Sequence, residues 1–358
     1  MLTGIIRKLL YALFTLFGVV TVIFFLFNVL PGDPAKMMLG QNQNADQIAA
    51  VKKKYGFDQP ISKQYLYYLN DLSLLSVHSN SPDDYTYLSD SKYTYLSIYS
   101  GTNNTWVFKW PYLRESFTKQ GKKVSQVISE TLPNTFVLAI SAILIAISLG
   151  IVLGVISALK KDTFLDRSIQ IISTVGMSVP SFFSAIIFAW FFGYVLHEFT
   201  NLEMTGSLYE LDDFGETVEL KWKNLILPAI VLGIRPLAVV IQLMRNSLLE
   251  VLSQDYIRTA RAKGLSELQV VKNHAIKNAL NPVVTAISGW FASMLAGAVF
   301  VEYVFGWNGL GKEIVNALNT LDLPVIMGAV LVIAIIFITI NILVDFVYAW
   351  LDPRVKSA

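Results

Sequence analysis

The sequence predicts an all-α integral membrane protein with six transmembrane helices, a cytoplasmic loop, and a large external segment between the first two helices. Hydrophobic residues make up 54% of the 358 positions and charged residues only 15%. The mean hydropathy of +0.52 is far above that of an ordinary soluble domain. The apolar residues are also gathered in long runs, which the core of a soluble domain does not need.

Six of these runs are long enough to cross a bilayer as helices, which takes about 20 apolar residues. They cover residues 9–30, 136–159, 171–196, 225–244, 283–305 and 325–348. The first run is too long for the core of a signal peptide, and Leu-Pro-Gly-Asp-Pro follows it in place of a small-residue cleavage site. The chain has no cysteine, which excludes disulfides, thiolate metal sites and a thiol nucleophile.

Basic residues in the connections predict the orientation, because they concentrate on the cytoplasmic side of a membrane. They occur at both ends of the chain, after the second run and between the fourth and fifth runs: Arg7, Lys8, Lys160, Lys161, Arg167, Arg245, Arg258, Arg261, Lys263, Lys272, Lys277, Arg354 and Lys356. The connection 197–223 is dominated by acidic residues instead. We therefore expect both termini to be cytoplasmic and the connection 197–223 to be external.

The stretch GWNGLGKE (306–313) is similar to a nucleotide-binding phosphate loop, G-x-x-x-x-G-K-[ST]. Such a loop needs Ser or Thr after the lysine and lies between a strand and a helix. Here Glu313 follows the lysine and a membrane helix precedes the turn, on the side where nucleotides are scarce. We interpret the stretch as a glycine turn that opens a short helix at 312–321.

The external segment, residues 31–130, is too long for an ordinary connection and should fold by itself. Its first part predicts two helices separated at Gly56 and Pro60. A polar insert near 77–105 contains KYTYLSIYSG, which predicts a short strand or hairpin. The chain thus divides into residues 1–30, 31–130, 131–350 (the transmembrane core) and 351–358 (a cytoplasmic tail).

The loop between the fourth and fifth runs, residues 246–282, is polar but keeps a helical periodicity. A first helix should end at Gly264, because glycine tolerates the left-handed conformation that closes many helices. A second should begin at Ser266, since Ser266 and Gln269 form an S-x-x-Q capping box. The alternative interpretation is that the loop is a solvated basic connection, whose charges reflect only its position on the cytoplasmic side.

This loop resembles the hallmark of the integral membrane permeases of binding-protein-dependent ABC importers, E-A-A-x3-G-x9-I-x-L-P. The first three positions and the glycine of that pattern fall on Arg258, Thr259, Ala260 and Gly264. Its final Ile, Leu and Pro fall on His274, Ile276 and Lys277. At these positions the loop resembles the peptide and nickel importer branch of the family. The pattern of that branch is DYIRTARAKGL followed by HAL-x-NAL-x-P, which is close to residues 255–265 and 274–282 here.

Other stretches resemble the same branch along nearly the whole chain. They are LPGDP (30–34), GFDQP (56–60), LPNT (132–135), SVPSF (178–182), GAVFVEYVFGWNGLG (297–311) and NILVDFVYAWLDPR (341–354). Asn308 stands where proline is expected, and Gln242 stands where arginine is usual. The polar insert near 77–105 also departs from the branch, which leaves its role open.

The resemblance implies a transport subunit of the bacterial cytoplasmic membrane, with no catalytic residues, no nucleotide site and no cofactor of its own. Its loop would form a coupling helix seated in a groove of an ATPase, through Arg258, Thr259, Ala260, Lys263, Gly264, Leu265, Ser266 and Glu267. The implied partners are two ABC ATPase subunits, a second related permease chain or a second copy of this one, and an external substrate-binding protein. Nucleic-acid binding is not expected, because the basic loop is poor in aromatic residues.

Two ionisable residues within the runs are candidates for the substrate path, because such groups are costly in a membrane. Arg235 in the fourth run could pair with a peptide carboxylate or with an acid of the protein, and Glu302 borders the expected external mouth.

Oligopeptides or dipeptides are the expected substrates, since the runs hold no cluster of His or Met. A nickel or metal-chelate importer is the alternative. A proton-coupled secondary transporter is a weaker one, because it would need paired carboxylates or a His relay, and the chain shows no internal repeat.

Overall fold

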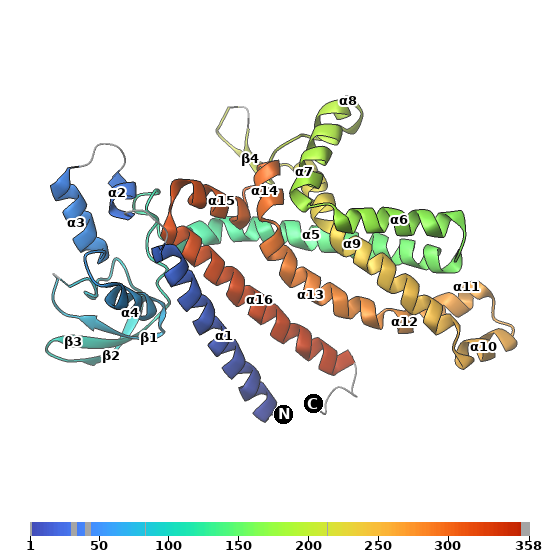
Figure 1. Cartoon of the computed structure of the whole chain (residues 1–358), viewed down its shortest axis with the longest axis horizontal. Coiled ribbons are helices and arrows are strands. Elements are labelled where there is room, and N and C mark those ends of the chain that lie inside the picture. Colours follow the sequence, from blue (N-terminus) through green and yellow to red (C-terminus); the bar gives the residue numbers. More distant parts are fainter. Residues whose placement is uncertain (1, 30–33, 40–43, 83, 213, 352–358) are drawn as a thin grey trace. The chain divides into compact units, whose positions relative to one another are not determined.

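The computed structural model describes residues 2–29, 34–39, 44–82, 84–212 and 214–351. Most of LPGDP and of the predicted tail 351–358 lies outside these residues. The chain forms two compact units, Met1–Glu130 with Ile314–Ala334 (unit 1) and Thr131–Glu313 with Ile335–Ala358 (unit 2). The elements of both units are labelled in Figure 1.

Among the described residues, four helices are long and apolar enough to cross a membrane by themselves. They are α1 (Leu2–Val29), α5 (Val124–Leu159), α9 (Lys223–Leu252) and α16 (Leu323–Leu351). Two bent helix pairs raise the number of candidate spans to six if each pair is one span. The expected helical membrane protein is therefore confirmed, while the count of six transmembrane helices stays a prediction.

The continuous helix predicted at 171–196 is broken at Pro180. The structure has α6 (Phe164–Ser178), α7 (Ser181–Trp190) and a π-helical turn η1 (Phe191–Val195), with a bend of 109° between the first helix and the rest. Val179 is extended, with φ −79° and ψ 131°, because a residue that precedes proline disfavours the helical region. A short helix α8 (His197–Thr200) follows.

The fifth predicted span is also divided. It consists of α13 (Asn281–Gly297) and α14 (Val299–Phe305), and α13 itself follows the preceding helical stretch Glu267–Ala279 at a bend of 48°. The fourth span is longer than predicted, because α9 continues to Leu252 and takes in the first residues of the predicted loop 246–282.

The segment before α5 contains the two predicted helices, α3 (Ala45–Tyr55) and α4 (Ile61–Leu72), after a short α2 (Pro34–Leu39). Gly56 closes α3 in the left-handed region, at φ 71°, and Pro60 precedes α4. The predicted separation at Gly56 and Pro60 is confirmed.

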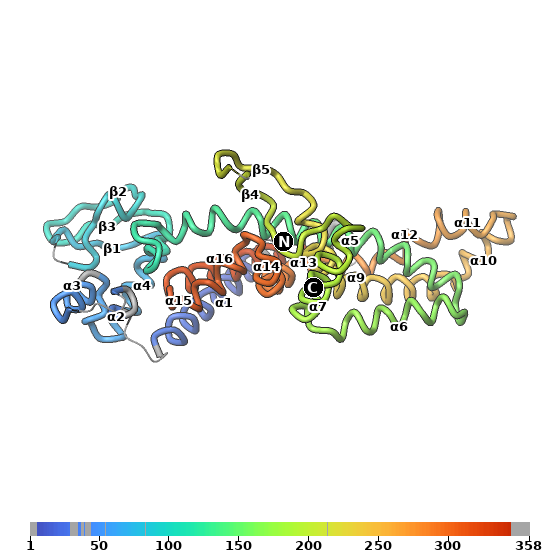
Figure 2. Tube along the Cα trace, turned by 90° about the horizontal axis from the view of Figure 1, so that it is seen from above, coloured from blue at the N-terminus to red at the C-terminus, as the bar shows by residue number. Residues whose placement is uncertain are grey.

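The polar insert forms a three-stranded antiparallel sheet in the order β1-β3-β2, with β1 (Leu75–Ser79), β2 (Tyr95–Ser100) and β3 (Asn104–Lys109). The strand predicted in KYTYLSIYSG is β2. In unit 2, β4 (Tyr209–Leu211) and β5 (Val218–Leu220) form a hairpin that Figure 2 shows as an elongated loop. The prediction of an all-α protein is therefore wrong in these two connections, where alternating side chains and turn residues favour strands.

A buried charged cluster attaches the insert to α4. The Asp71 carboxylate, which is 1% exposed, accepts hydrogen bonds from the hydroxyls of Tyr85 and Tyr93, both at 3.2 Å, and from Arg114 Nε at 3.0 Å. Lys109 Nζ donates to the carbonyl of Ser73 at 3.2 Å, and burial lowers the pKa of this lysine to about 8. Because buried charges are stable only when they are paired and hydrogen-bonded, this cluster fixes the insert in place.

Candidate functional site

The predicted glycine turn of the loop is present and connects α10 (Asp255–Ala262) to α11 (Glu267–Val270). Gly264 has φ 81°, in the left-handed region, as the sequence predicted. The Ser266 hydroxyl accepts the N–H of Gln269, and Gln269 Oε1 accepts the N–H of Ser266 at 3.0 Å. The predicted capping box is therefore confirmed. The helical chain continues through η2 (Val271–Ala275) and α12 (Ile276–Ala279).

The loop has a buried side and an exposed side. Ile257 and Val270 are fully buried in a cluster that includes Met244 and Leu248 of α9, and Ala260 packs in the same cluster. Of the predicted contact residues, those on the exposed side are Arg258, Thr259, Lys263, Gly264, Ser266 and Glu267. Leu265 is half-buried. Most of the predicted residues are thus exposed around the turn between α10 and α11, at an end of α9 (Figure 1), whereas Ala260 packs in the buried cluster.

Two features of this surface were missed by the sequence analysis. Arg261 bridges the turn to Glu267, with Nε and Nη2 donating to the two carboxylate oxygens at 2.8 and 3.1 Å. Leu268 is 76% exposed although it is apolar. An apolar residue two positions after a capping serine, in an otherwise polar loop, was the available signal for Leu268.

An ion pair between the buried Asp166 and the half-buried Arg245 joins α6 to the end of α9 that carries the loop. Arg245 donates from Nε and Nη2 to the two oxygens of Asp166 at 2.8 and 2.7 Å, and Ser157 of α5 donates to the same carboxylate at 2.5 Å. The sequence analysis used Arg245 only as a topological charge, because its partner lies 79 positions away. Two parallel hydrogen bonds hold α6 and α9 in one orientation.

Arg235 lies on the exposed face of α9, next to the break between α6 and α7. It lines a cavity of about 80 Å³ together with Ser181 and Ser184 of α7 and Trp290 of α13. Ser181 is the first residue of α7, where backbone N–H groups have no partner within the helix. The cavity therefore combines a guanidinium, two hydroxyls and the start of a helix, a set that suits an anionic group.

Glu302 lies elsewhere and is fully buried. One of its carboxylate oxygens accepts the N–H of Gly311 at 2.7 Å and that of Lys312 at 3.2 Å. These two residues begin α15 (Leu310–Thr320), so the glutamate caps the start of this helix. Its contacts are those of a structural group.

The capped helix follows the Gly306 turn, residues 306–309, in which Gly306 is left-handed at φ 68°. Two other parts of unit 2, α5 and the segment around Ser207, hold this turn and the residue that follows it. Trp307 Nε1 donates to the carbonyl of Asn134, and the N–H of Leu310 donates to Thr135 Oγ1. The N–H of Asn308 donates to Ser207 Oγ. The predicted short helix at 312–321 is confirmed, with its start two residues earlier.

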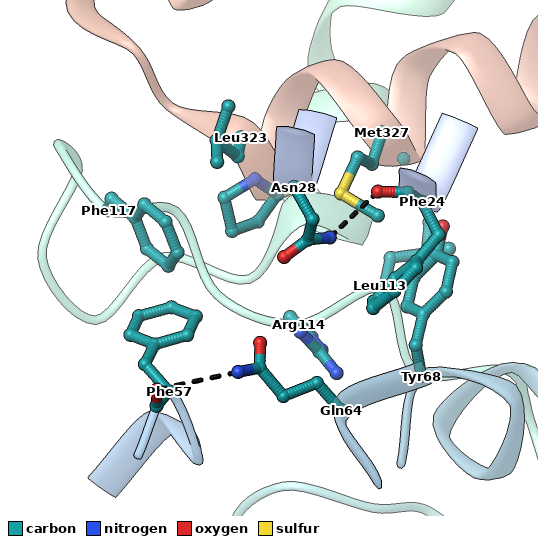
Figure 3. A pocket seen from close by; sticks show the side chains of 12 residues that line it. Phe24, Asn28, Phe57, Gln64, Tyr68, Leu113, Arg114, Phe117, Leu323 and Met327 are labelled. Carbon is teal, nitrogen blue, oxygen red and sulfur yellow. Dashed lines mark hydrogen bonds between the residues drawn. The ribbon is translucent and has the colours of Figure 1, made fainter. Parts of the chain in front are cut away.

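Unit 1 has a cavity between α1, α4 and the start of α16, shown in Figure 3. Its volume of about 30 Å³ leaves room for only a few water molecules. The side-chain amides of Asn28 and Gln64 donate hydrogen bonds to the backbone carbonyls of Phe24 and Phe57, respectively (Figure 3). The cavity is too small for a peptide, and its polar side chains serve the local backbone.

Comparison with known proteins places these features in a family. Residues 150–357 match the family described as the inner membrane component of binding-protein-dependent transport systems. Residues 1–82 match the N-terminal part of the membrane component of such systems. Together the two matches include the loop, the helix break and the Gly306 turn.

Curated relatives match along the full chain. The dipeptide transport system permease DppB of Alkalihalophilus pseudofirmus is 34% identical and covers 99% of this chain and 100% of its own length. The di/tripeptide permease DppB of Pseudomonas aeruginosa is 32% identical and covers 99% of both chains. Among solved structures, the inward-facing methionine ABC transporter MetNI aligns with 64% of this chain and 97% of its own at 16% identity and a TM-score of 0.49.

Proposed function

This chain belongs to the family of inner membrane components of binding-protein-dependent transport systems, and we propose that it moves oligopeptides or dipeptides across the bacterial cytoplasmic membrane. The names of its full-length relatives support a peptide substrate. The observation in the structure that carries this choice is Arg235, an exposed cation on a spanning helix.

An exposed arginine on a membrane helix is costly in lipid. Arg235 is twelve residues after the start of α9, or about 18 Å along the helix at 1.5 Å per residue, and therefore lies near the bilayer centre if α9 spans it. We infer that this face of α9 lines a hydrated passage or meets another protein chain. A peptide carboxylate is a suitable partner, because it forms two parallel hydrogen bonds with a guanidinium. The helix start at Ser181 adds to this attraction, as discontinuous helices do in other transporters.

A metal ion is the alternative cargo. A bare divalent cation would be repelled by Arg235, which speaks against it, whereas an anionic chelate would not be. Within the described part of the chain, no group of three or more His, Asp or Glu is placed to hold a metal ion. Peptide is therefore the substrate that the charges of this cavity favour.

The exposed surface around Gly264 is the proposed contact with an ATPase. Arg258, Lys263 and Glu267 offer charges on this surface, and Leu268 offers an apolar centre. Because Ile257 and Val270 anchor the loop to α9, a push on this surface would move the spanning helix instead of only bending the loop. The break at Pro180 and the bend before α13 provide places where such a motion is absorbed.

The proposed assembly has two ATPase subunits, this chain with a second related permease or a second copy of itself, and an external substrate-binding protein. The basic loop faces the cytoplasm, as do both termini, and the acidic hairpin of β4 and β5 faces outward. Six spans follow if each bent pair crosses the membrane once. ATP hydrolysis belongs to the partner subunits.

The first experiment is mild affinity purification of the tagged chain from its own membranes, followed by an ATPase assay. We expect ATPase subunits and a second permease in the eluate, together with hydrolysis. A lone chain, recovered in several mild detergents without ATPase, would overturn the importer assignment.

The contact is tested by Gly264→Asp, compared with Gly121→Asp as a matched change at another exposed, left-handed glycine with no atom within 4 Å of an added Cβ. We expect Gly264→Asp to abolish copurification of the ATPase. Unchanged hydrolysis and import in this variant would show that the Gly264 surface is not the contact.

The cargo is tested by uptake of labelled dipeptide or nickel into proteoliposomes that contain the assembled importer. We expect ATP-dependent dipeptide uptake, with a higher KM in Arg235→Gln than in Arg235→Lys, which keeps the charge. ATP-dependent uptake of nickel without uptake of peptide would establish the metal alternative.

A further inference from the structure

The loop that carries α10 and α11 packs on the ends of two helices. Ile257 and Ala260 of α10 lie in one buried cluster with Met244 and Leu248 of α9 and with Ala158 of α5. Ala158 is the second-to-last residue of α5. A displacement of the loop therefore acts on α5 and α9 together.

Close contacts at two glycines hold α5 against α9. An added Cβ at Gly150 would lie 2.6 Å from Cγ1 of Val240, and one at Gly154 would lie 2.9 Å from the carbonyl oxygen of Ile241. The two glycines are four residues apart and therefore share one face of α5. Small residues on one face let the backbones of two membrane helices approach closely. We expect α5 and α9 to move as one body.

The helix α6 is attached to α9 by a contact near each of its ends. At the end next to the loop, Arg245 of α9 donates two hydrogen bonds to Asp166. At the other end, an added Cβ at Gly176 would lie 2.9 Å from Cγ2 of Ile234. At 1.5 Å per residue, these contacts are about 15 Å apart along α6 and about 17 Å apart along α9. Because the two lengths agree, α6 lies along α9 and runs in the opposite direction.

The contact next to the loop joins three helices at one carboxylate. Asp166 is only 2% exposed, and besides Arg245 it accepts the hydroxyl of Ser157 at the end of α5. The N–H of Asp162, in the turn between α5 and α6, also donates to it at 3.0 Å. Separating a buried charge from its partner is costly, so this pair resists a displacement of α6 from α9.

The far end of α6 forms part of the cavity at Arg235, because Gly176 and the extended Val179 both line it. If the loop moved α9 without α6, this wall would separate from Arg235. We propose that the Asp166–Arg245 pair makes α6 follow α9 when an ATPase moves the loop, so that the cavity keeps its shape during transport. Both residues are positioning residues, and this inference rests on the proposed ATP-driven transport.

The first test measures labelled dipeptide imported per ATP hydrolysed, with the assembled importer in proteoliposomes. Arg245→Lys keeps the charge but not the two parallel hydrogen bonds, and Asp166→Asn removes the ion pair. We expect both to lower the ratio by about fivefold or more, the lower end of the range for coupling between two sites. Arg167→Lys, the same change at the next and exposed residue of α6, should leave the ratio unchanged. A purely structural pair would lower hydrolysis and import in proportion, and an unchanged ratio in both variants overturns the proposal.

The second test needs no cargo, so its outcome is separate from that of the uptake assay. Because the chain has no cysteine, spin labels can be attached to Ile172→Cys of α6 and Glu250→Cys of α9, both exposed, in the assembled importer in lipid nanodiscs. We expect the distance between the labels to be the same without nucleotide and with bound ATP, and to change on ATP binding in Arg245→Lys. A distance that changes while the pair is intact overturns the proposal, even if the variant fails to assemble.

Discussion

The Gly264 turn and the Gly306 turn both contain a left-handed glycine, but they differ in how far along the chain their stabilising residues lie. Each places a left-handed glycine between two helices, and each is followed by a capped helix. The Gly264 turn is capped by its own Ser266 and braced by Arg261 and Glu267, all within a few positions. The Gly306 turn also has a local contact, from Lys312 Nζ to the carbonyl of Gly306 at 2.9 Å. In addition it is held by Asn134, Thr135 and Ser207, which are more than 100 positions away.

This difference separates a surface that can meet a partner from one that holds the protein together. An added Cβ at Gly264 would have no atom within 4 Å, so the turn is open to the outside. An added Cβ at Gly311, behind the Gly306 turn, would lie 2.5 Å from the Cα of Val299. A partner protein can bind to a turn stabilised by neighbouring residues, or shift it, without disturbing the core. A turn stabilised by distant residues cannot shift without disturbing the segments that hold it.

The largest effect is expected for Gly311→Ala. Its methyl group meets backbone, which cannot rotate away, so α14 and α15 must separate. We expect the free energy of unfolding to fall by about 3 kcal/mol. Gly264→Ala should cost only about 1 kcal/mol, because its cost is the left-handed backbone alone. Denaturant unfolding of both variants in detergent measures the contrast, and equal losses would remove the distinction between the two turns.

A smaller effect is expected for Glu302→Ala. The change leaves the N–H groups of Gly311 and Lys312 without an acceptor in a buried place, and we expect a loss of about 2 kcal/mol in unfolding free energy. Glu302→Gln keeps an acceptor oxygen and should lose less than half as much. If Glu302→Ala unfolds at the same denaturant concentration as the parent chain, the cap contributes nothing.

The smallest effect is expected for Ser266→Ala, which removes the hydroxyl that caps α11. We expect about 1 kcal/mol, confined to the loop. Amide hydrogen exchange should therefore accelerate in α11 and remain unchanged in α15, while Ser266→Asn, which can still cap, preserves the protection. Faster exchange in α15 would contradict a locally built turn.

Local features of this fold could be predicted because short-range rules decide them. Gly56 and Pro60 separate two helices in the structure as they do in the sequence, and the Ser266 capping box forms as expected. Each of these depends on the backbone preferences of one residue or on a contact three positions away. The break at Pro180 follows the same logic, although its bend of 109° was not foreseen.

The candidate sites were predicted unevenly for the same reason. The turn at Gly264 and the exposure of the residues around it could be predicted because the loop pattern is local, while their role as a contact stays a prediction. Ala260 was expected on that surface and is buried, since only the packing on α9 determines which side of α10 faces inward. Glu302 was a candidate for the substrate path, and the structure places it as a buried helix cap.

The sequence by itself determined that the chain is a membrane protein, where most of its helices lie and where its glycine turns occur, because hydrophobic runs and backbone preferences act over a few residues. The tertiary structure decided the pairing of Asp166 with Arg245, the capping by Glu302 and the exposure of Trp106 and Phe108 in β3. Those features join residues far apart in the chain, and their energies depend on which distant groups reach the same place.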